Sequence, residues 1–314
     1  MCVSRRLLNL SIVLFAFFPP AIELATRVAF SHISALEHRV ATEHARALSL
    51  RHGAGHPTVL FAGNSLLLTD VDMDQLRRLL PRQLQVERFV VEATYFIDWQ
   101  FGVRRLFADG ARPDYLVLVL APANYAASAI RGDYSAYYLF STSDIPLVGR
   151  ELGLTRTAES SLYVARYSLF WAARSNTRSL ILRRTFPEYT SVLHMLATSS
   201  AVAPHNPVSL NEARLRQLDD TARQYGCSLI LLVPPGFDDT GEQALIQAAG
   251  RAGVKTLVPV RNGAWPATLF FGDRFHLTTA GAGLFTAQLA EYLSPILSSV
   301  GTDPAAGIAQ SARQ

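Results

Sequence analysis

The chain has 314 residues, 49% of them hydrophobic and 17% charged, and a mass of 34.5 kDa. This composition is typical of a folded protein with a large core, and it excludes disorder as the main state. The formal charge is +4 and the sequence pI about 9.2, but the arginines are scattered and form no basic blocks interleaved with aromatic residues. We therefore do not expect a nucleic-acid-binding protein.

The N-terminal segment, residues 1–30, predicts a signal anchor or transmembrane segment. Arg5 and Arg6 precede an apolar run at residues 7–22, which a proline pair interrupts. The run is short for a spanning helix and long for the apolar part of a signal peptide. The lack of a clear cleavage site after the prolines favours a retained anchor over a cleaved signal of a secreted protein or a buried helix of a cytosolic one. Arginines on the cytoplasmic side would place the rest of the chain in the periplasm or outside the cell.

Residues 31–56 are polar, have helical spacing and end in glycines, which predicts a stalk helix between anchor and domain. Five histidines lie in this stretch. A helical pair of metal ligands needs a spacing of three or four residues, and the single pair that has it is separated by glycines that should end the helix. We interpret all five as solvated and expect no metal site; they are His32, His38, His44, His52 and His56.

From residue 57 short apolar runs alternate with amphipathic segments, which predicts a parallel sheet with helices on both faces. The runs YLVLVL and SLILLV lack polar alternation, as strands buried on both faces should. The predicted α/β domain covers residues 57–298, and residues 299–314 predict a disordered tail. Strands are expected at 58–62, 88–93, 115–120, 228–233 and 254–259, and helices at 73–80, 97–108, 209–224, 241–251 and 279–297.

A long insertion at residues 125–208 separates the two halves of this pattern and is rich in Tyr, Phe, Arg and Ser. Helical spacing of apolar residues in ESSLYVARYSLFWAAR predicts a helical lid or subdomain. An insertion that leaves the carboxyl end of a strand is well placed to cover a site. A packing elaboration or a partner-binding surface explains the same pattern equally well.

The stretch Gly63-Asn64-Ser65 follows the first expected strand, at the sheet edge where functional groups of parallel sheets gather. Gly63 permits a tight turn, and a serine that opens the next helix has its oxygen beside backbone N–H donors. Taken alone, this pattern fits an ordinary N-cap serine better than a nucleophile.

A nucleophilic serine needs a general base, and FFGDRFHLTTAGAGLF at residues 270–285 supplies one. Asp273 and His276 lie three residues apart ahead of the last helix, so we expect His276 at the same sheet edge as Ser65. Asp273 can accept the imidazole N–H and hold the tautomer that presents the other nitrogen to Ser65. Taken alone, His276 is more simply a half-buried loop histidine.

Together these residues resemble the first and last motifs of the SGNH (GDSL-type) hydrolase superfamily, over residues 57–125 and 209–298. The resemblance implies a three-layer α/β/α, flavodoxin-like fold. It also implies Ser65 as nucleophile, His276 as base and Asp273 as the carboxylate that orients the base. Asn64 stands in place of the commoner aspartate.

The resemblance further implies an oxyanion hole made of the N–H of Ser65, the N–H near Thr94 and the side-chain amide of Asn124. Asn124, in VLVLAPANYA, matches the family's asparagine, without the glycine that usually precedes it. The family's backbone glycine has no counterpart in VEATYFIDW, so Thr94 is the nearest candidate. Loss of one donor costs about 10² to 10³ in rate.

The function implied is a serine esterase or O-acyltransferase that acts outside the cytoplasm on an acylated saccharide or a similar ester. Anchor and insertion also resemble membrane-associated SGNH-like proteins of bacterial envelope and exopolysaccharide pathways, which implies a polysaccharide substrate and envelope polysaccharide machinery as partners. No cofactor and no metal are expected. The missing glycine motivates an alternative, a non-catalytic envelope protein that binds or assembles polysaccharide. A nucleotide-binding domain is disfavoured, because the first strand–helix turn lacks G-x-G-x-x-G.

Overall fold

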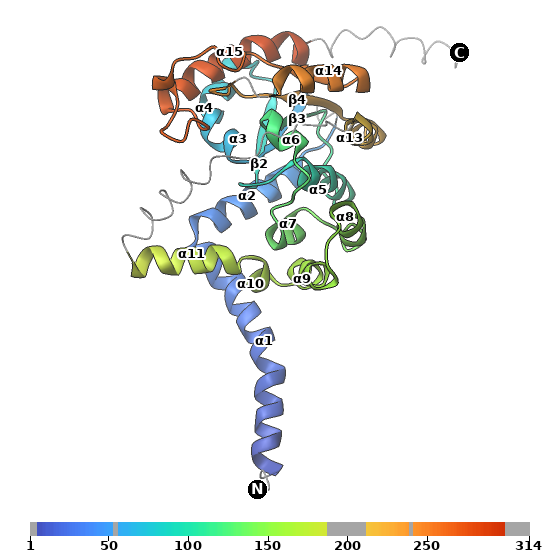
Figure 1. Ribbon diagram of the computed structural model, residues 1–314, viewed down its shortest axis with the longest axis vertical. Helices are drawn as coiled ribbons and strands as arrows, with labels where there is room; N and C mark the ends of the chain where they lie inside the picture. The colour runs from blue at the N-terminus through green and yellow to red at the C-terminus, as the bar shows by residue number, and fades with distance from the viewer. Residues whose placement is uncertain (1–4, 53–55, 187–211, 239–240, 299–314) are drawn as a thin grey trace, which may run out of the picture. The chain divides into compact units, whose positions relative to one another are not determined.

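Five short segments form one parallel sheet in the computed structural model, which describes residues 5–52, 56–186, 212–238 and 241–298 (Figure 1). The strand order β2-β1-β3-β4-β5 is the order of flavodoxin-like sheets. The expected parallel sheet is therefore confirmed. The strands are β1 (Thr58–Gly63), β2 (Gln85–Val90), β3 (Tyr115–Val119), β4 (Ser228–Leu232) and β5 (Lys255–Leu257).

Strand β2 starts three residues earlier than the predicted strand at 88–93. It lies at the edge of the sheet and pairs with β1, with Thr58 opposite Gln85 and Gly63 opposite Val90. The Gln85 side chain is exposed and that of Glu87 is half-buried. An edge strand tolerates such polar residues. The predicted strand begins too late because the prediction required a continuous apolar run.

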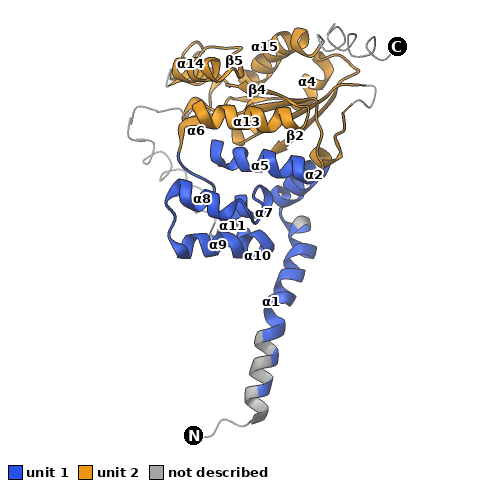
Figure 2. Cartoon of the chain, turned by 90° about the vertical axis from the view of Figure 1, so that its right-hand side faces the viewer, with its two compact units in different colours: residues 1–45, 94–109, 128–206 blue, residues 46–93, 110–127, 207–314 orange. Residues whose placement is uncertain are grey.

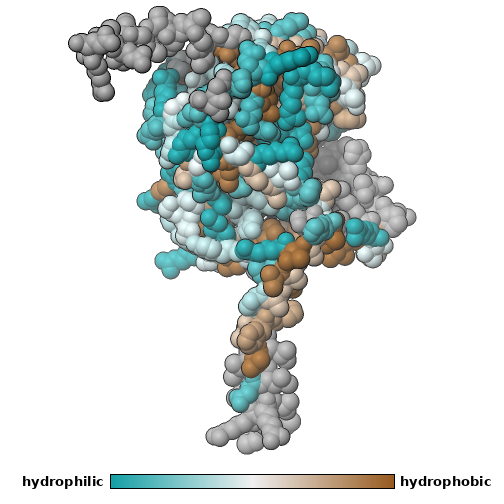
Figure 3. Space-filling view, turned by 180° about the vertical axis from the view of Figure 1, so that it is seen from behind, coloured by the Kyte–Doolittle hydropathy of each residue, from teal (hydrophilic) through white to brown (hydrophobic). Residues whose placement is uncertain are grey.

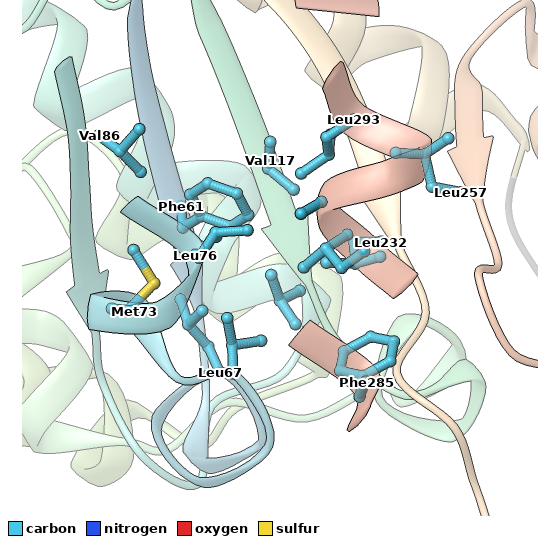
Figure 4. Packing of buried hydrophobic residues seen from close by; sticks show 14 of the residues in the cluster. Phe61, Leu67, Met73, Leu76, Val86, Val117, Leu232, Leu257, Phe285 and Leu293 are labelled. Carbon is cyan, nitrogen blue, oxygen red and sulfur yellow. The ribbon is translucent and has the colours of Figure 1, made fainter. Parts of the chain in front are cut away.

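One face of the sheet is covered by α3 (Ser65–Asp70), α4 (Met73–Leu79) and α15 (Thr279–Ser298). Figure 4 shows Phe61 and Val117 of the strands packed with Leu76 of α4 and Phe285 of α15. All four side chains are fully buried. Burial of one side chain of this size stabilises the fold by about 1.5 to 3 kcal/mol.

The opposite face is buried as well, because Leu60, Leu116 and Leu231 point away from this core and have no exposed surface. Helix α13 (Glu212–Gln224) contacts β4, and α14 (Glu242–Ala252) contacts β5. These helices, α4 and α15 lie close to their expected positions. Sheet strands covered on both sides explain why the central runs are apolar without alternation.

The chain divides into two units, coloured in Figure 2. Unit 2 comprises residues 46–93, 110–127 and 207–314 and contains the sheet. Unit 1 comprises residues 1–45, 94–109 and 128–206. Its helices are α1 (Arg5–Ile33), α5 (Phe96–Ala108), α7 (Asp133–Tyr138), α8 (Ile145–Leu152), α9 (Arg156–Tyr167), α10 (Leu169–Ala172) and α11 (Arg174–Thr185), and α2 (Ala35–Ser49) runs from unit 1 into unit 2.

The predicted insertion is helical in its described part, α7 to α11, while residues 187–208 and the tail 299–314 lie outside the described residues. Glu23 of α1 joins α1 to this part of unit 1. Its carboxylate accepts hydrogen bonds from Ser168 Oγ at 2.7 Å and from the N–H groups of Leu169 and Phe170 at 2.9 and 3.1 Å. A carboxylate at the start of α10 satisfies N–H groups that lack partners within the helix.

Helix α1 runs through Pro19 and Pro20, which we expected to interrupt the apolar run. Its side chains at Phe17 and Phe18 are 70% and 66% exposed, and Figure 3 shows hydrophobic side chains along the part of α1 that is coloured. Among the described residues, no helix combines the length and the apolar character that a membrane span needs. The predicted transmembrane anchor is therefore not supported.

The segment 31–56, predicted as a stalk helix, is divided between the end of α1 and α2, and α2 is packed against other residues. Helix α1 ends at Ile33, and in α2 the side chains of Val40 and Ala47 are fully buried. His44 is half-buried, with its ring edge-on to that of Tyr138 at 6.3 Å between centroids. The prediction that all five histidines are solvated is wrong for His44, because α2 turns this side of the helix toward α7.

Gly63, the last residue of β1, lies so close to β3 that a Cβ atom there would come 2.4 Å from the Val119 carbonyl oxygen. We expect Gly63→Ala to lower the free energy of unfolding by about 1 to 3 kcal/mol, because the strands must move apart. The matched control is Gly250→Ala, whose methyl group enters open space on α14 and should stabilise by about 0.5 to 1 kcal/mol. Urea unfolding measures both variants, and equal stability of the two would contradict the close approach.

Candidate active site

The turn between β1 and α3 places Ser65 at the carboxyl edge of the sheet. The neighbours of β1 are β2 and β3, so this turn lies where the strand order changes direction, the position at which such sheets bind ligands. Asn64 caps α3, and its Oδ1 accepts a hydrogen bond from the Leu66 N–H at 3.1 Å. Ser65 is thus the first helical residue and not the cap. Its half-buried side chain is free of the capping role that the local sequence pattern suggested.

His276 and Asp273 lie in a tight loop ahead of α15. Phe270 and Leu277 pair as an antiparallel bridge, and the Phe271 N–H donates to the His276 carbonyl at 2.8 Å. Inside the loop, Arg274 has a left-handed backbone with φ 55°. Asp273 Oδ1 accepts from the N–H groups of Phe275 and His276 at 2.9 and 3.1 Å, which holds the loop closed around the carboxylate.

The structure brings Ser65, His276 and Asp273 together in one chain of hydrogen bonds. Ser65 Oγ lies 2.9 Å from His276 Nε2, and His276 Nδ1 lies 2.8 Å from Asp273 Oδ2. Both distances are within the range of direct hydrogen bonds between a nucleophile, its base and an orienting group. The arrangement can move a proton from the serine hydroxyl to the imidazole.

The charge of Asp273 decides which nitrogen of His276 faces the serine. Burial would raise the pKa of Asp273, but hydrogen bonds from the His276 ring, from the Phe275 N–H and from the His276 N–H outweigh it and lower this pKa. An ionised Asp273 accepts the Nδ1–H of the imidazole. The lone pair of Nε2 is then directed at the Ser65 hydroxyl, as a general base requires.

A second pair of side chains connects the Ser65 turn with the end of β3. Asn124 lies in α6 (Pro122–Ala126), and its Oδ1 accepts from Asn64 Nδ2 at 3.2 Å. Asn64 thus accepts through Oδ1 from the Leu66 N–H and donates through its NH₂ group to Asn124. The Asn124 NH₂ group is therefore oriented away from Asn64 and can serve as the donor that was predicted for it.

Thr94 is the remaining residue predicted for the oxyanion hole. It belongs to unit 1, its side chain is fully buried, and its Oγ1 accepts from Trp99 Nε1 at 2.9 Å. Its N–H as an oxyanion donor stays a prediction. The preceding residue, Ala93, has a left-handed backbone with φ 55°, which glycine adopts at little cost and alanine only under strain. A glycine-type conformation thus follows β2 although no glycine marks it in the sequence.

Asp70 is a functional candidate that sequence reasoning missed. It ends α3, has no exposed surface, and its Oδ1 accepts from the N–H of Leu277, the residue after His276, at 2.9 Å. Its Oδ2 is buried without a hydrogen-bond partner among the described residues. Asp70 therefore ties the helix of the serine to the loop of the histidine. Nothing in the sequence sets it apart from a carboxylate at an exposed helix end.

Unit 2 contains a small pocket of about 140 Å³ whose lining includes residues adjacent in sequence to the predicted site. It is lined by the neighbours in sequence of two predicted site residues, Leu66 after Ser65 and Phe275 before His276. Pro122, Pro235 and Phe237 make much of the remaining wall apolar, and the Arg274 guanidinium lies 4.8 Å from the centroid of the Phe237 ring. Within the described residues no cluster of three or more His, Cys, Asp or Glu side chains is suited to hold a metal ion.

No family model and no curated protein matches the chain. Among solved structures, a catalytic mutant of Axe2, an acetylxylan esterase from Geobacillus stearothermophilus, is similar at 12% identity and a TM-score of 0.38, over 76% of this chain and 93% of that one. LAE5, an alpha/beta hydrolase from the metagenome of Lake Arreo, Spain, is similar at 12% identity and a TM-score of 0.38, over 78% of this chain and 98% of that one. These TM-scores are too low to carry an argument.

Burial raises the pKa of Asp70 from 3.8 to about 6, against opposing hydrogen bonds from Leu277 and Thr69. The folded state then binds this proton more tightly than the unfolded chain, so its contribution to stability is present below about pH 4 and is lost as the pH rises to about 6. Relative to Asp70→Asn, which cannot ionise, the unmodified chain should lose about 2 to 3 kcal/mol across this window. Urea unfolding of both proteins from pH 4 to 7 measures the difference, and parallel stability curves would contradict the shift.

Proposed function

We propose that the chain is a serine-dependent ester hydrolase of the SGNH type, or an O-acyltransferase that uses the same chemistry. The single observation that carries the proposal is the hydrogen-bonded chain from Ser65 through His276 to Asp273. It joins residues 211 positions apart in the sequence, and each side chain is in the order that nucleophilic catalysis requires. A serine that only caps a helix has no need of a hydrogen-bonded imidazole and carboxylate in this order.

In the proposed reaction His276 Nε2 takes the hydroxyl proton while Ser65 Oγ forms a bond to the ester carbonyl carbon. The carbonyl oxygen gains negative charge, which the Asn124 NH₂ group and the Ser65 N–H stabilise. The tetrahedral intermediate then loses its alcohol, which takes the proton from His276, and leaves an acyl group on Ser65. Water or a second hydroxyl group attacks this acyl group by the same steps in reverse.

The size of the pocket supports a short acyl group. Its volume of about 140 Å³ leaves room for a group such as acetyl and not for a long alkyl chain. Its apolar wall suits the methyl end of such a group, and Leu66, the residue after Ser65, contributes to that wall. The saccharide part of the substrate is proposed from the sequence resemblance alone.

We expect Ser65→Ala to lower the rate of aryl acetate hydrolysis by at least about 10³-fold, since the nucleophile is lost. The matched control is Ser228→Ala, an exposed serine of β4, which should keep the rate of the unmodified chain. Stopped spectrophotometric assays of the released phenol measure both. An unchanged rate in Ser65→Ala would remove the assignment of the nucleophile.

The same assay with a saccharide acceptor separates hydrolysis from transfer, because transfer yields an acetylated saccharide in place of free acetate. A serine-directed fluorophosphonate probe addresses the non-catalytic alternative. Labelling of Ser65 supports the enzyme, whereas an unlabelled protein that still binds polysaccharide favours a binding or assembly role in the cell envelope.

We also propose an extracytoplasmic location with attachment of α1 to a membrane. The arginine pair ahead of the apolar run and the exposed apolar side chains of α1, such as Phe17 and Phe18, support this proposal. The full chain should then sediment with membranes and be degraded by protease added outside spheroplasts. A chain recovered in the soluble fraction and shielded from that protease would exclude attachment.

A further inference from the structure

Unit 1 contains a cavity of about 590 Å³ that the reaction above does not use. Residues of α1, α2, α5, α7, α9 and α10 line it, and none of them belongs to the unit of Ser65. Three arginines from three different helices line it, together with aromatic and histidine residues. The residues that matter here are Arg27, Arg105, Arg166, Glu37, His44 and Tyr138.

Two of the three arginines have carboxylate partners. Arg27 Nε lies 2.6 Å from Glu23 Oε1, and Arg105 Nε lies 3.3 Å from Asp109 Oδ2. Arg166 forms no ion pair with any residue that the structure describes, and its Nε is buried without a hydrogen-bond partner among them. Arg166 is therefore the one of these three arginines that has no carboxylate contact among the described residues.

Two further titratable side chains, Glu37 and His44, line the cavity beside the arginines. Burial raises the pKa of Glu37, which is 2% exposed and accepts the Tyr138 hydroxyl at 2.9 Å. Burial, and next the charge of Arg105, lower the pKa of His44 to about 4, so this ring is neutral at neutral pH. Burial and then the positive charge of Arg166 also lower the pKa of Arg105.

We propose that this cavity binds a phosphate group through the guanidinium groups of Arg105 and Arg166, with Arg27 as a third partner. A phosphate group has acceptor oxygens on several sides, so it can satisfy several planar guanidinium groups at once. A carboxylate offers two oxygens in one plane and is satisfied by a single arginine. The convergence of three guanidinium groups from separate helices therefore favours phosphate.

Two sources can supply such a group, a soluble phosphate or phosphate ester and the headgroup of a phospholipid. Leu24 and Val28, near Arg27 on α1, are 64% and 61% exposed, so α1 carries exposed apolar side chains in the same segment as one of the three arginines. The chemistry at the arginines is the same for both sources. The experiment has one arm for each.

Full-length protein is titrated with inorganic phosphate by calorimetry, and is sedimented with vesicles of phosphatidylcholine with and without phosphatidylglycerol. We expect binding in at least one arm, weakened about tenfold or more in Arg166→Gln because one charged hydrogen-bonding partner is lost. Arg150→Gln, an equal loss of charge at an exposed site of α8, should bind as the unmodified chain does. Binding in the phosphate arm identifies a soluble ligand, and binding to phosphatidylglycerol vesicles alone identifies a headgroup.

Circular dichroism and urea midpoints establish that the variants are folded, and Arg166→Lys, which keeps the charge, provides a second variant with an expected intermediate affinity. Absence of binding in both arms overturns the proposal. Equal losses in Arg166→Gln and Arg150→Gln also overturn it, because attraction would then follow net charge and not this cavity.

Discussion

The hydrogen bond between Ser65 Oγ and His276 Nε2 is the contact on which the remaining chemistry depends. It exists because parallel strands end at one edge of the sheet, so that the turn after β1 and the loop before α15 meet there. The Asp70 carboxylate, at the end of α3, stabilises this arrangement because it accepts a hydrogen bond from the Leu277 N–H in the loop that carries His276. A proton can pass between the two loops only while the sheet core and the packing of α15 hold them in register.

Much of the fold could be predicted from sequence, because burial on both faces leaves a plain signal. Strands β1, β3 and β4 are runs of buried apolar residues and were placed within one residue at each end. Strand β2 was misplaced, since an edge strand mixes Gln85 and Glu87 with buried residues and has no continuous run. Helix α1 continues through the proline pair that interrupts the apolar run: prolines inside a helix lower its stability, but they do not forbid it when the rest of the segment favours a helix.

The three residues of the hydrogen-bonded chain could be predicted, because their residue types and spacing indicate nucleophilic chemistry. Ser65 followed a glycine turn, and Asp273 and His276 had the spacing at which one side chain can orient the other. Asp70 was missed because its role depends on its burial, and Ala93 because its role depends on its left-handed backbone. Neither property can be recognised from a single aspartate or alanine in the sequence. The basic cavity of unit 1 was missed as well, because Arg27, Arg105 and Arg166 come from three distant segments of the chain.

The amide of Asn64 determines which group of the Asn124 side chain forms the hydrogen bond between them. An aspartate in place of Asn64 would have no side-chain N–H to donate. Asn124 would then have to rotate its amide and donate its own NH₂ group to that aspartate. With an amide at both positions, the oxygen of Asn124 accepts from Asn64, and the NH₂ group of Asn124 takes no part in this hydrogen bond. Neither amide titrates, so this polarity is the same in acid and in base for as long as the turn stays folded.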